Sequence, residues 1–243
     1  MRHYIPALSL IVIAYNEEEY IGSCMEAIQQ QTFPPDEVIV VNNNSTDKTA
    51  EIAKTFPFVT LINETEQGMI PARDAGFNAA KGDLLARIDA DTRIPIDWVE
   101  KVHRILDNRA QDIVGVSGPQ YFYAVQDSTL RKITSDITSR YGFFAVSKIM
   151  LGHETLFGSN MVITKHAWQK VKNDVCHDSY KVHEDVDLAL HISQYGIILF
   201  DRDLIAGIST RAFLENTKKH VWRLKTWVKS VTHHRKLFVG PNR

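Results

Sequence analysis

The segment DLLARIDADTRIP, residues 83–95, places two aspartates, Asp89 and Asp91, one residue apart at the end of an apolar run. A short apolar run of this kind is typical of a strand that is buried on both faces. If the strand geometry continues, both carboxylates point to the same side, where they repel each other unless a cation neutralises them. Mg²⁺ and Mn²⁺ prefer oxygen ligands and keep open positions for substrate phosphates. The segment therefore predicts a strand end that binds a divalent cation, although an isolated Asp-x-Asp pair also occurs in solvated turns.

Three more apolar runs precede this strand, and each is followed by a helical pattern. The runs occupy residues 8–15, 37–41 and 59–64. A helix is expected within 16–31, and a loop that leads into a helix is expected within each of 42–56 and 68–82. Strands that alternate with helices at this spacing indicate βαβ units and a mostly parallel central sheet, which is an α/β fold. We expect Asn16 to cap the first helix, Ser45 or Thr46 to cap the second, and Gly82 to end the third.

The alternation becomes looser after residue 95. Helical patterns occupy residues 97–108, 127–150 and 184–196, with the last helix expected to end at Gly196. The remaining elements are two strands at 113–123 and 197–203, a strand leading into a helix at 156–171, and a basic helix with tryptophans at 214–238.

Composition places the chain among ordinary globular proteins. It has 243 residues, 44% apolar and 23% charged, with a formal net charge of −1. This length suits one large domain or two small ones, and the charge gives no strong attraction to nucleic acid. The apolar runs are too short to span a bilayer and no secretion signal is recognisable, so we expect a cytoplasmic protein in which Cys24 and Cys176 are reduced.

Polar residues follow the ends of the first, second and fourth predicted strands. They are Tyr15, Asn16 and Glu17 after the first, Asn42, Asn43 and Asn44 after the second, and Asp89 and Asp91 after the fourth. In open parallel sheets, ligands bind at the carboxyl ends of the strands, so we expect these groups to converge in one ligand site. The alternative for the asparagines is turn chemistry alone.

A second acidic group lies in the segment HEDVD, where Glu184 and Asp185 begin a predicted helix. A carboxylate at this point could act as the general base that deprotonates a hydroxyl nucleophile. Acidic residues in a first helical turn are also expected from the helix dipole alone. The segment is not the zinc motif H-E-x-x-H, because its last position is Asp187. Neither a P-loop, a G-x-G-x-x-G fingerprint nor a G-x-S-x-G elbow is present.

Four blocks taken together resemble the family 2 glycosyltransferases, which have the GT-A fold. The blocks are residues 8–53, 67–100, 157–171 and 184–196, and their order and spacing match over roughly residues 7–200. Each block is weakly specific alone and the combination is highly specific. The resemblance implies a Rossmann-like sheet, a metal-dependent enzyme, and inverting transfer of a sugar from a nucleotide donor to an acceptor hydroxyl.

The resemblance also implies a role for each matching residue. Asp185 would be the catalytic base, and Asp91 together with Asp89 would bind Mg²⁺ or Mn²⁺. The nucleotide would be bound by Ala14, Tyr15, Asn16, Glu17, Asn42, Asn43, Arg73 and Asp89. The donor sugar and acceptor would lie near Gly158, Ser159, Asn160 and Glu184. The chain departs from the family pattern at Asn42, where an acidic residue is usual, and at Asp74, where asparagine is common.

The basic segment 214–238 has two interpretations. An amphipathic basic helix with tryptophans suits a membrane surface, and equally a helix packed on its own domain. We expect a GT-A domain at 1–213, divided into a nucleotide half (1–95) and an acceptor half (96–213), followed by this helix and tail at 214–243. A membrane-bound tail would place the protein at the inner face of the cytoplasmic membrane and would fit a lipid-linked acceptor.

The expected donor is a nucleotide sugar, UDP-linked by preference or GDP-linked, and the acceptor is a saccharide or lipid-linked sugar of the cell envelope. Two alternatives remain open. A sugar-1-phosphate nucleotidyltransferase needs a glycine-rich basic loop near the N-terminus, where this chain has the acidic AYNEEEYIG, residues 14–22. A non-catalytic binder of sugar nucleotides would bind the nucleotide without turnover.

Overall fold

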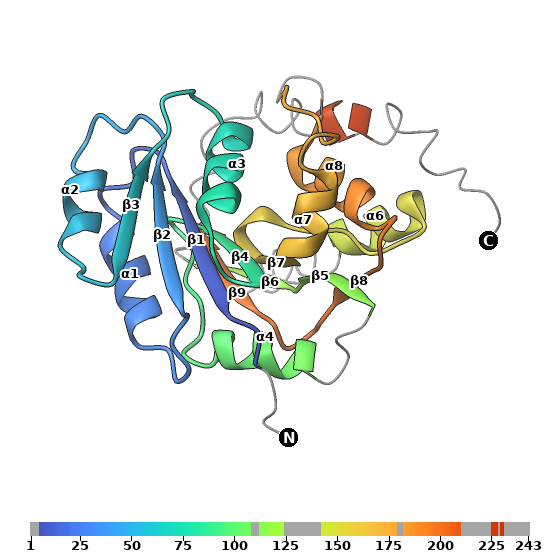
Figure 1. Cartoon of the computed structure of the whole chain (residues 1–243), viewed down its shortest axis with the longest axis horizontal. Helices are drawn as coiled ribbons and strands as arrows, with labels where there is room; N and C mark the ends of the chain where they lie inside the picture. The colour runs from blue at the N-terminus through green and yellow to red at the C-terminus, as the bar shows by residue number, and fades with distance from the viewer. Residues whose placement is uncertain are drawn as a thin grey trace, which may run out of the picture.

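The computed structural model describes residues 5–107, 112–123, 142–178, 182–209, 225–227 and 229–230. Its centre is a seven-stranded sheet with the strand order β3-β2-β1-β4-β7-β5-β8, and β6 pairs with β9 in a separate two-stranded sheet (Figure 1). The strands are β1 Leu8–Ala14, β2 Glu37–Asn42, β3 Val59–Asn63, β4 Leu84–Asp89, β5 Ile113–Ser117, β6 Gln120–Tyr123, β7 Met161–Thr164, β8 Ile197–Phe200 and β9 Ala206–Ser209.

The predicted α/β fold with a mostly parallel sheet is confirmed. β1 is parallel to both β2 and β4, while β7 runs antiparallel to its neighbours β4 and β5. All seven residues of β1 are buried, which explains its nearly continuous apolar sequence, because helices cover both faces of the sheet. β4 lies between β1 and β7, so the Asp89 end of β4 is near the middle of the sheet.

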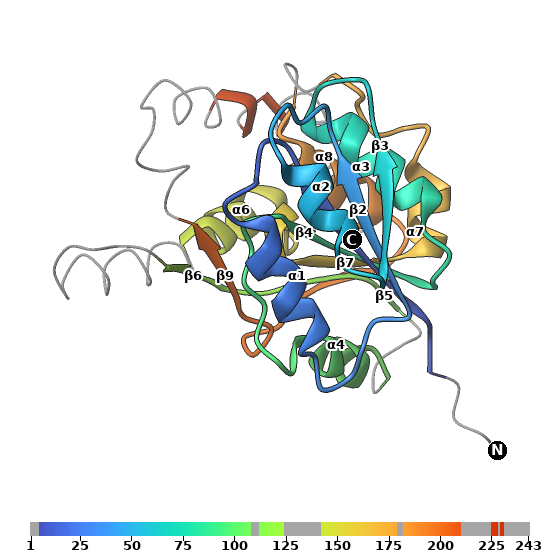
Figure 2. The same cartoon turned by 90° about the vertical axis from the view of Figure 1, so that its left-hand side faces the viewer.

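Helices cover the sheet in two layers, and each layer has its own core. Apolar residues of α1, α2 and α4 pack on one face of β1, and those of α3, α7 and α8 pack on the other side (Figures 1 and 2). The helices are α1 Ile21–Gln29, α2 Thr49–Lys54, α3 Met69–Ala79, α4 Trp98–Asp107, α6 Phe143–Leu151, α7 Lys165–Val171 and α8 Glu184–Ile192, with a 3₁₀ turn, η2, at Gly158–Asn160.

The predicted caps of the first two helices are wrong. α1 begins at Ile21, because Asn16 adopts a left-handed conformation with φ 53° and its Oδ1 accepts a hydrogen bond from Thr46 N at 2.8 Å. α2 begins at Thr49, and Ser45 instead accepts a hydrogen bond from Asn16 N at 3.1 Å. These polar side chains connect the loops after β1 and β2, so they are not available as caps.

The predicted glycine ends of two helices are also wrong, since α3 ends at Ala79 and α8 at Ile192. Both positions require glycine for a reason other than ending a helix. A Cβ atom at Gly82 would lie 2.7 Å from the Ala7 carbonyl oxygen, and one at Gly196 would lie 2.5 Å from the Asp112 carbonyl oxygen. Each glycine therefore permits a close approach between backbone segments at the start of a strand.

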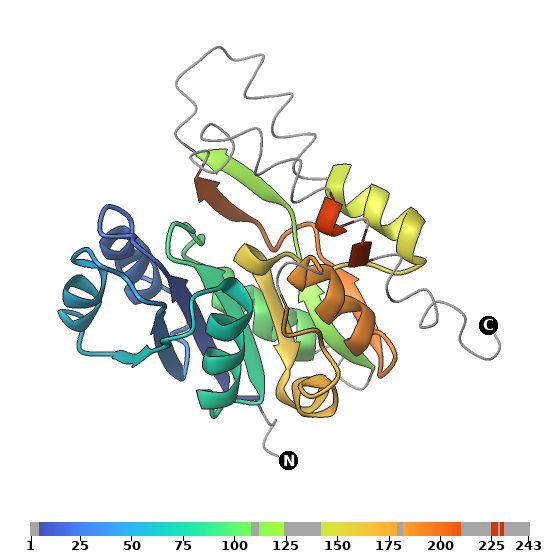
Figure 3. The same ribbon diagram turned by 90° about the horizontal axis from the view of Figure 1, so that it is seen from above.

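The single strand expected over residues 113–123 is two strands in different sheets. The chain leaves β5 at Ser117 and enters β6 at Gln120, and Figure 3 shows the β6–β9 pair set apart from the large sheet. A Cβ atom at Gly118 would lie 2.0 Å from the Leu204 carbonyl oxygen, so the turn requires glycine. The proline that follows cannot donate a ladder hydrogen bond, which also favours a break.

Two predicted helices lie largely outside the described residues. Of the helix expected over 127–150, the structure describes the part from residue 142 onward, which forms α6. Of the segment 214–238, it describes residues 225–227 and 229–230, which are helical. Within the described part of the chain, no helix has the length and apolar character needed to cross a bilayer. Both cysteines are free thiols, as expected.

Candidate active site

The carboxyl ends of β1, β2 and β4 lie side by side, which brings the polar groups that follow them to one edge of the sheet. In the strand register, Ala14 pairs with Asn42, and Ile13 pairs with Asp89. Ala14 is buried, whereas the Tyr15 side chain is 49% exposed at this edge. The backbone N–H of Glu17 donates to the Thr49 hydroxyl at 2.7 Å, which fixes the loop after β1 against α2.

Two asparagines at the end of β2, Asn42 and Asn43, organise the neighbouring loops. The Asn42 carboxamide accepts from Ser45 N at 3.2 Å and donates to the Asn63 side chain at 2.9 Å. The Asn43 carboxamide donates to the Glu66 carbonyl at 2.6 Å and accepts from Gly68 N at 2.8 Å. An aspartate has no N–H group for the bonds that these amides donate, which gives a structural reason for asparagine at both positions.

Asp89 is the last residue of β4, and the chain turns directly after it. Thr92 N donates to the Asp89 carbonyl at 2.9 Å, so the strand ends at Asp89 and the condition for strand alternation to place both carboxylates on one side is not met. The Asp89 carboxylate accepts from Arg87 Nη2 at 3.3 Å and from the Ser159 hydroxyl. The Tyr123 hydroxyl donates to the Asp91 carbonyl and thereby ties the turn to β6.

Asp185 lies in the first turn of α8, and its carboxylate is held from two sides. Its Oδ2 accepts from the backbone N–H of Gly158 at 2.9 Å, and its Oδ1 lies 3.4 Å from Arg87 Nη1. The residue is only 6% exposed. Burial and the neighbouring Glu184 carboxylate raise the pKa of Asp185 well above its usual range, although Arg87 opposes this shift.

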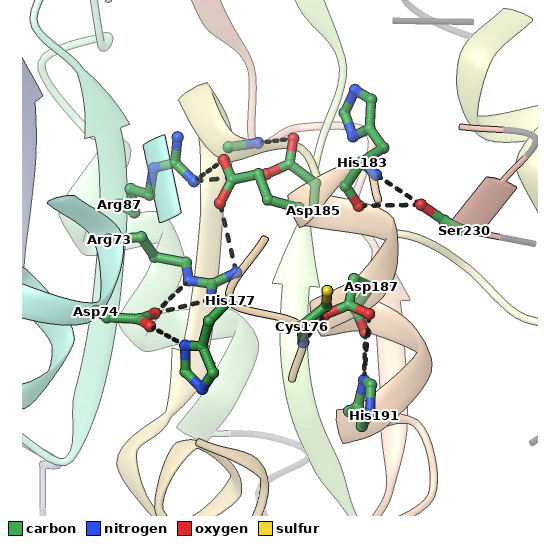
Figure 4. A network of polar contacts seen from close by, with 12 residues as sticks. Arg73, Asp74, Arg87, Cys176, His177, His183, Asp185, Asp187, His191 and Ser230 are labelled. Carbon is green, nitrogen blue, oxygen red and sulfur yellow. Dashed lines mark hydrogen bonds and ion pairs between the residues drawn. The ribbon is translucent and has the colours of Figure 1, made fainter. Parts of the chain in front are cut away.

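Glu184 pairs with two buried arginines, Arg87 and Arg73, both of which Figure 4 labels in this network of polar contacts. Its Oε1 lies 2.5 Å from Arg87 Nη1 and its Oε2 lies 3.4 Å from Arg73 Nη1. Burial alone would raise the pKa of Glu184, but the two guanidinium groups more than offset it, so the pKa lies below its usual range. The adjacent carboxylates of Glu184 and Asp185 are therefore driven in opposite directions, as in acid–base sites that need one charged and one proton-accepting group.

Arg73 and Asn160 are both inaccessible to solvent. Arg73 has no exposed surface, pairs with Asp74 at 2.7 Å, and lies over the Trp168 ring at 5.6 Å. Asn160 accepts from Trp98 Nε1 at 3.0 Å and is likewise fully buried. Both residues therefore hold neighbouring side chains in place, and neither presents a surface to a substrate in this structure.

The donor set at the end of β4 fits a divalent cation that is also held by a substrate. Among the described residues, no group of three or more His, Cys, Asp or Glu side chains is arranged to hold a metal ion. Mg²⁺ is commonly bound by one or two carboxylates together with substrate phosphates and water, so a complete protein cage is not required. Asp91 and Asp89 supply two such carboxylates at the sheet edge where a diphosphate would bind.

Sequence reasoning missed Arg87, which contacts three carboxylates of this site. A signal was present, because a charged residue at an interior position of an apolar strand is costly unless it is paired. Its partners Glu184 and Asp185 are far away in the sequence, so the pairing itself could not be deduced.

An α/β sheet with acidic groups at its carboxyl edge places the chain among α/β folds that bind ligands at this edge, and comparison with known proteins gives the family. The Glycosyl transferase family 2 model matches residues 9–171, more than half of the chain. The chain belongs to this family.

Curated relatives match part of the chain. AglE, a glycosyltransferase of Haloferax volcanii, is 35% identical over 122 residues, 47% of this chain and 40% of that protein. EpsH of Bacillus subtilis is 31% identical over 140 residues, 56% of this chain and 39% of that protein. The chain thus spans about two fifths of the length of these two relatives.

Solved structures share the fold. The mannosyltransferase PcManGT from Pyrobaculum calidifontis, in complex with GDP-Man and Mn²⁺, has a TM-score of 0.73 at 21% identity, covering 99% of this chain and 66% of that one. TarS 1-349 of S. aureus, in complex with UDP-GlcNAc, has a TM-score of 0.62 at 19% identity, covering 84% and 59%. At these identities the likeness establishes the GT-A fold.

Proposed function

We propose that this chain is a metal-dependent inverting glycosyltransferase that moves a sugar from a nucleotide donor to an acceptor hydroxyl in cell-envelope polysaccharide or glycolipid synthesis. The observation that carries the proposal is the Asp185 carboxylate, which is buried, oriented by the Gly158 N–H, and joined through Arg87 to the aspartate at the end of β4. A base and a diphosphate site held in fixed relation are what a displacement at an anomeric carbon requires.

In the proposed reaction, the oxygen of the acceptor hydroxyl forms a bond to the anomeric carbon while Asp185 takes the proton of that hydroxyl. The bond from that carbon to the donor diphosphate breaks, and the nucleoside diphosphate leaves with the electron pair. Attack opposite the leaving group inverts the configuration. General-base assistance of this kind contributes roughly 10²–10⁴ in rate.

Asp91 and Asp89 would hold the divalent cation, Mg²⁺ or Mn²⁺. When bound, such a cation supplies positive charge that stabilises the leaving diphosphate. This use of the Asp-x-Asp pair explains why two carboxylates are retained so close together at the end of a buried strand.

The donor assignment rests on the residues at the sheet edge and on the relatives. We assign the nucleotide to the ends of two neighbouring strands and the loops that follow them, at Ala14, Tyr15, Asn16 and Glu17 for β1 and at Asn42 and Asn43 for β2. Similar folds bind GDP-Man in one protein and UDP-GlcNAc in another, so both bases are candidates here, with UDP preferred. Gly158, Ser159 and Glu184 would shape the sugar and acceptor region, with residues 1–95 as the nucleotide half and 96–213 as the acceptor half.

A peripheral contact with the membrane forms part of the proposal. Three large apolar residues in the described part of α6 are exposed, namely Val146 (53%), Ile149 (82%) and Met150 (51%). Trp227 packs on the cluster that contains Leu151, which places the helical piece 225–227 and its exposed Lys225 close to the end of α6. Apolar side chains beside basic ones suit an anionic lipid surface and a lipid-linked saccharide acceptor.

A thermal-shift screen of nucleotide sugars with and without Mn²⁺, followed by a donor-turnover assay, tests the function. The expected signature is stabilisation that requires both ligands, by mass action, together with release of the nucleoside diphosphate. Binding without turnover on any acceptor or water would favour a non-catalytic binder, and formation of a nucleotide sugar from a sugar 1-phosphate would favour a nucleotidyltransferase.

A further inference from the structure

Arg87 is an unusual residue for its place in the fold. It lies inside β4, at the centre of the seven-stranded sheet, and its side chain is only 1% exposed. The other residues of β4 from Leu84 to Ile88 are apolar and buried. A guanidinium group cannot lose its charge in a protein, so at this position it requires ion pairs.

The contacts of Arg87 join the two halves of the proposed site. Nη1 lies 2.5 Å from Glu184 and 3.4 Å from Asp185, both on α8. Nη2 lies 3.3 Å from Asp89, at the end of Arg87's own strand. One rigid, planar group thus contacts the proposed base and the carboxylate of the proposed diphosphate site at the same time.

We propose that Arg87 is a positioning residue that fixes the Asp185 base relative to the Asp89 carboxylate, with Glu184 as its counter-ion and not as a second base. The inference rests on the proposed function, because Asp185 is the base of that function. It extends that function by assigning Arg87 a part that neither the family resemblance nor the sequence suggested.

The charges that face Asp185 support this assignment. They are Glu184 on the same helix and Arg87 on β4, while Arg73 on α3 pairs with Glu184 and Asp74. Glu184 is paired with both arginines, and its lowered pKa keeps it ionised. Asp185 has the longer contact with Arg87, one backbone N–H, and a hydrogen bond with Glu184 that raises its pKa further, so of the two carboxylates it is the one that can exchange a proton.

The alternative is a purely structural ion pair in the core. Such a group would be expected to have all its N–H groups satisfied, whereas Arg87 Nε is buried and has no hydrogen-bond partner within the described parts of the chain. A stabilising core pair also has no need to contact a carboxylate at the solvent-facing strand end, where the Asp89 side chain is 26% exposed. Both observations favour a role in the site.

Arg87→Met tests the proposal, with Arg73→Met as the matched control. Both arginines are buried and both pair with Glu184, but only Arg87 contacts Asp185 and Asp89. Loss of the nearby positive charge should raise the pKa of Asp185 by about 1–3 units, so the acid limb of the kcat/KM profile should move upward. We expect kcat to fall by roughly 100-fold, the size of a general-base contribution. In Arg73→Met the acid limb should stay where it is in the unmodified protein.

Arg87→Lys keeps the charge and removes the planar fork. We expect the acid limb of the kcat/KM profile in Arg87→Lys to lie at the same pH as in the unmodified protein, because the positive charge is kept. We expect kcat to stay at least tenfold below that of the unmodified protein, because an ammonium group lacks the planar fork that binds two carboxylates at once. If Arg87→Met does not fold, as a thermal melt would show, Arg87→Lys decides alone. Unchanged kcat in Arg87→Lys, or an unchanged acid limb in a folded Arg87→Met, overturns the proposal.

A measurement without turnover separates this inference from the proposed function. The ¹³C carboxyl resonance of Asp185, assigned with Asp185→Asn, can be titrated in the unmodified protein and in Arg87→Met, or in Arg87→Lys if Arg87→Met does not fold. A higher titration midpoint in Arg87→Met, or an unshifted one in Arg87→Lys, supports the inference even if no sugar transfer is found. An unshifted midpoint in Arg87→Met overturns it even if the unmodified enzyme is active.

Discussion

The backbone N–H of Gly158 donates to the Asp185 carboxylate at 2.9 Å, at a position where the buried Arg87 leaves no room for a side chain. A Cβ atom on Gly158 would lie 2.7 Å from Arg87 Nη2, closer than a carbon and a nitrogen can pack. The glycine therefore lets the guanidinium group lie directly against η2 while the same backbone orients the base.

Gly158→Ala should damage the site more than the fold. The added methyl group must displace the buried guanidinium, and overpacking of this kind costs about 1–3 kcal/mol of unfolding free energy. We expect kcat to fall at least tenfold, measured beside a chemical denaturation curve. Gly22→Ala in α1 is the control, because its Cβ would meet Ile52 at an ordinary 3.7 Å. Equal kcat in both variants would contradict the role given to Gly158.

Asp185→Asn should abolish transfer with little effect on donor binding. The amide keeps the size of the side chain and can still accept the Gly158 N–H bond, but it cannot take a proton. We expect kcat to fall by roughly 10²–10⁴, while calorimetry shows donor and Mn²⁺ affinity close to that of the unmodified protein. Transfer at the unmodified rate would remove Asp185 as the base.

Asp91→Asn should lose both transfer and metal-dependent nucleotide binding. An amide oxygen is a neutral and weaker ligand for a hard dication than a carboxylate. The thermal shift produced by donor plus Mn²⁺ should therefore collapse, while the melting temperature without ligands changes little, since the strand ends before this residue. A full metal-dependent shift in the variant would show that the cation is held elsewhere.

The pH profile follows from the raised pKa of Asp185. A base acts only when it is deprotonated, so kcat/KM should fall as the pH drops through that raised value. The acid limb should therefore lie well above about 3.9, the usual pKa of an aspartate. Initial rates at fixed ionic strength between pH 4 and 9 measure it. A rate that is constant down to about pH 4.5 would mean that the group is not perturbed when substrate is attacked.

Local patterns in the sequence predicted the parts of this site that depend on local chemistry. The apolar run before Asp89 had to be a buried strand, and the acidic start of α8 had to lie at a helix N-terminus. Long-range pairing could not be predicted in this way. Arg87 meets Glu184 across 97 positions, and only the packing of α8 against the sheet brings them together.

The same limit explains the errors in the helix boundaries. Asn16 is a residue type that often caps helices. Here its side chain accepts a hydrogen bond from Thr46 N, 30 residues away, so it helps to hold the loops of the site together. Tertiary hydrogen bonds outcompeted the local capping preference here. Such competition is expected in the polar loops of a ligand site, because their side chains form hydrogen bonds with one another and are then not available to cap a helix.

Ile149→Asp should weaken binding to anionic membranes. Ile149 is 82% exposed on α6, and burial of an isoleucine in lipid contributes about 1.5–3 kcal/mol, so the variant should bind phosphatidylglycerol vesicles roughly tenfold less well. Co-sedimentation measures the fraction of protein bound to the vesicles. The same measurement with uncharged phosphatidylcholine vesicles shows how much of the binding depends on lipid charge. Ile96→Asp is the control, since Ile96 is 58% exposed but precedes α4, on the other side of the sheet from α8. Equal recovery of both variants and the unmodified protein in the supernatant would mean that α6 does not contact a membrane.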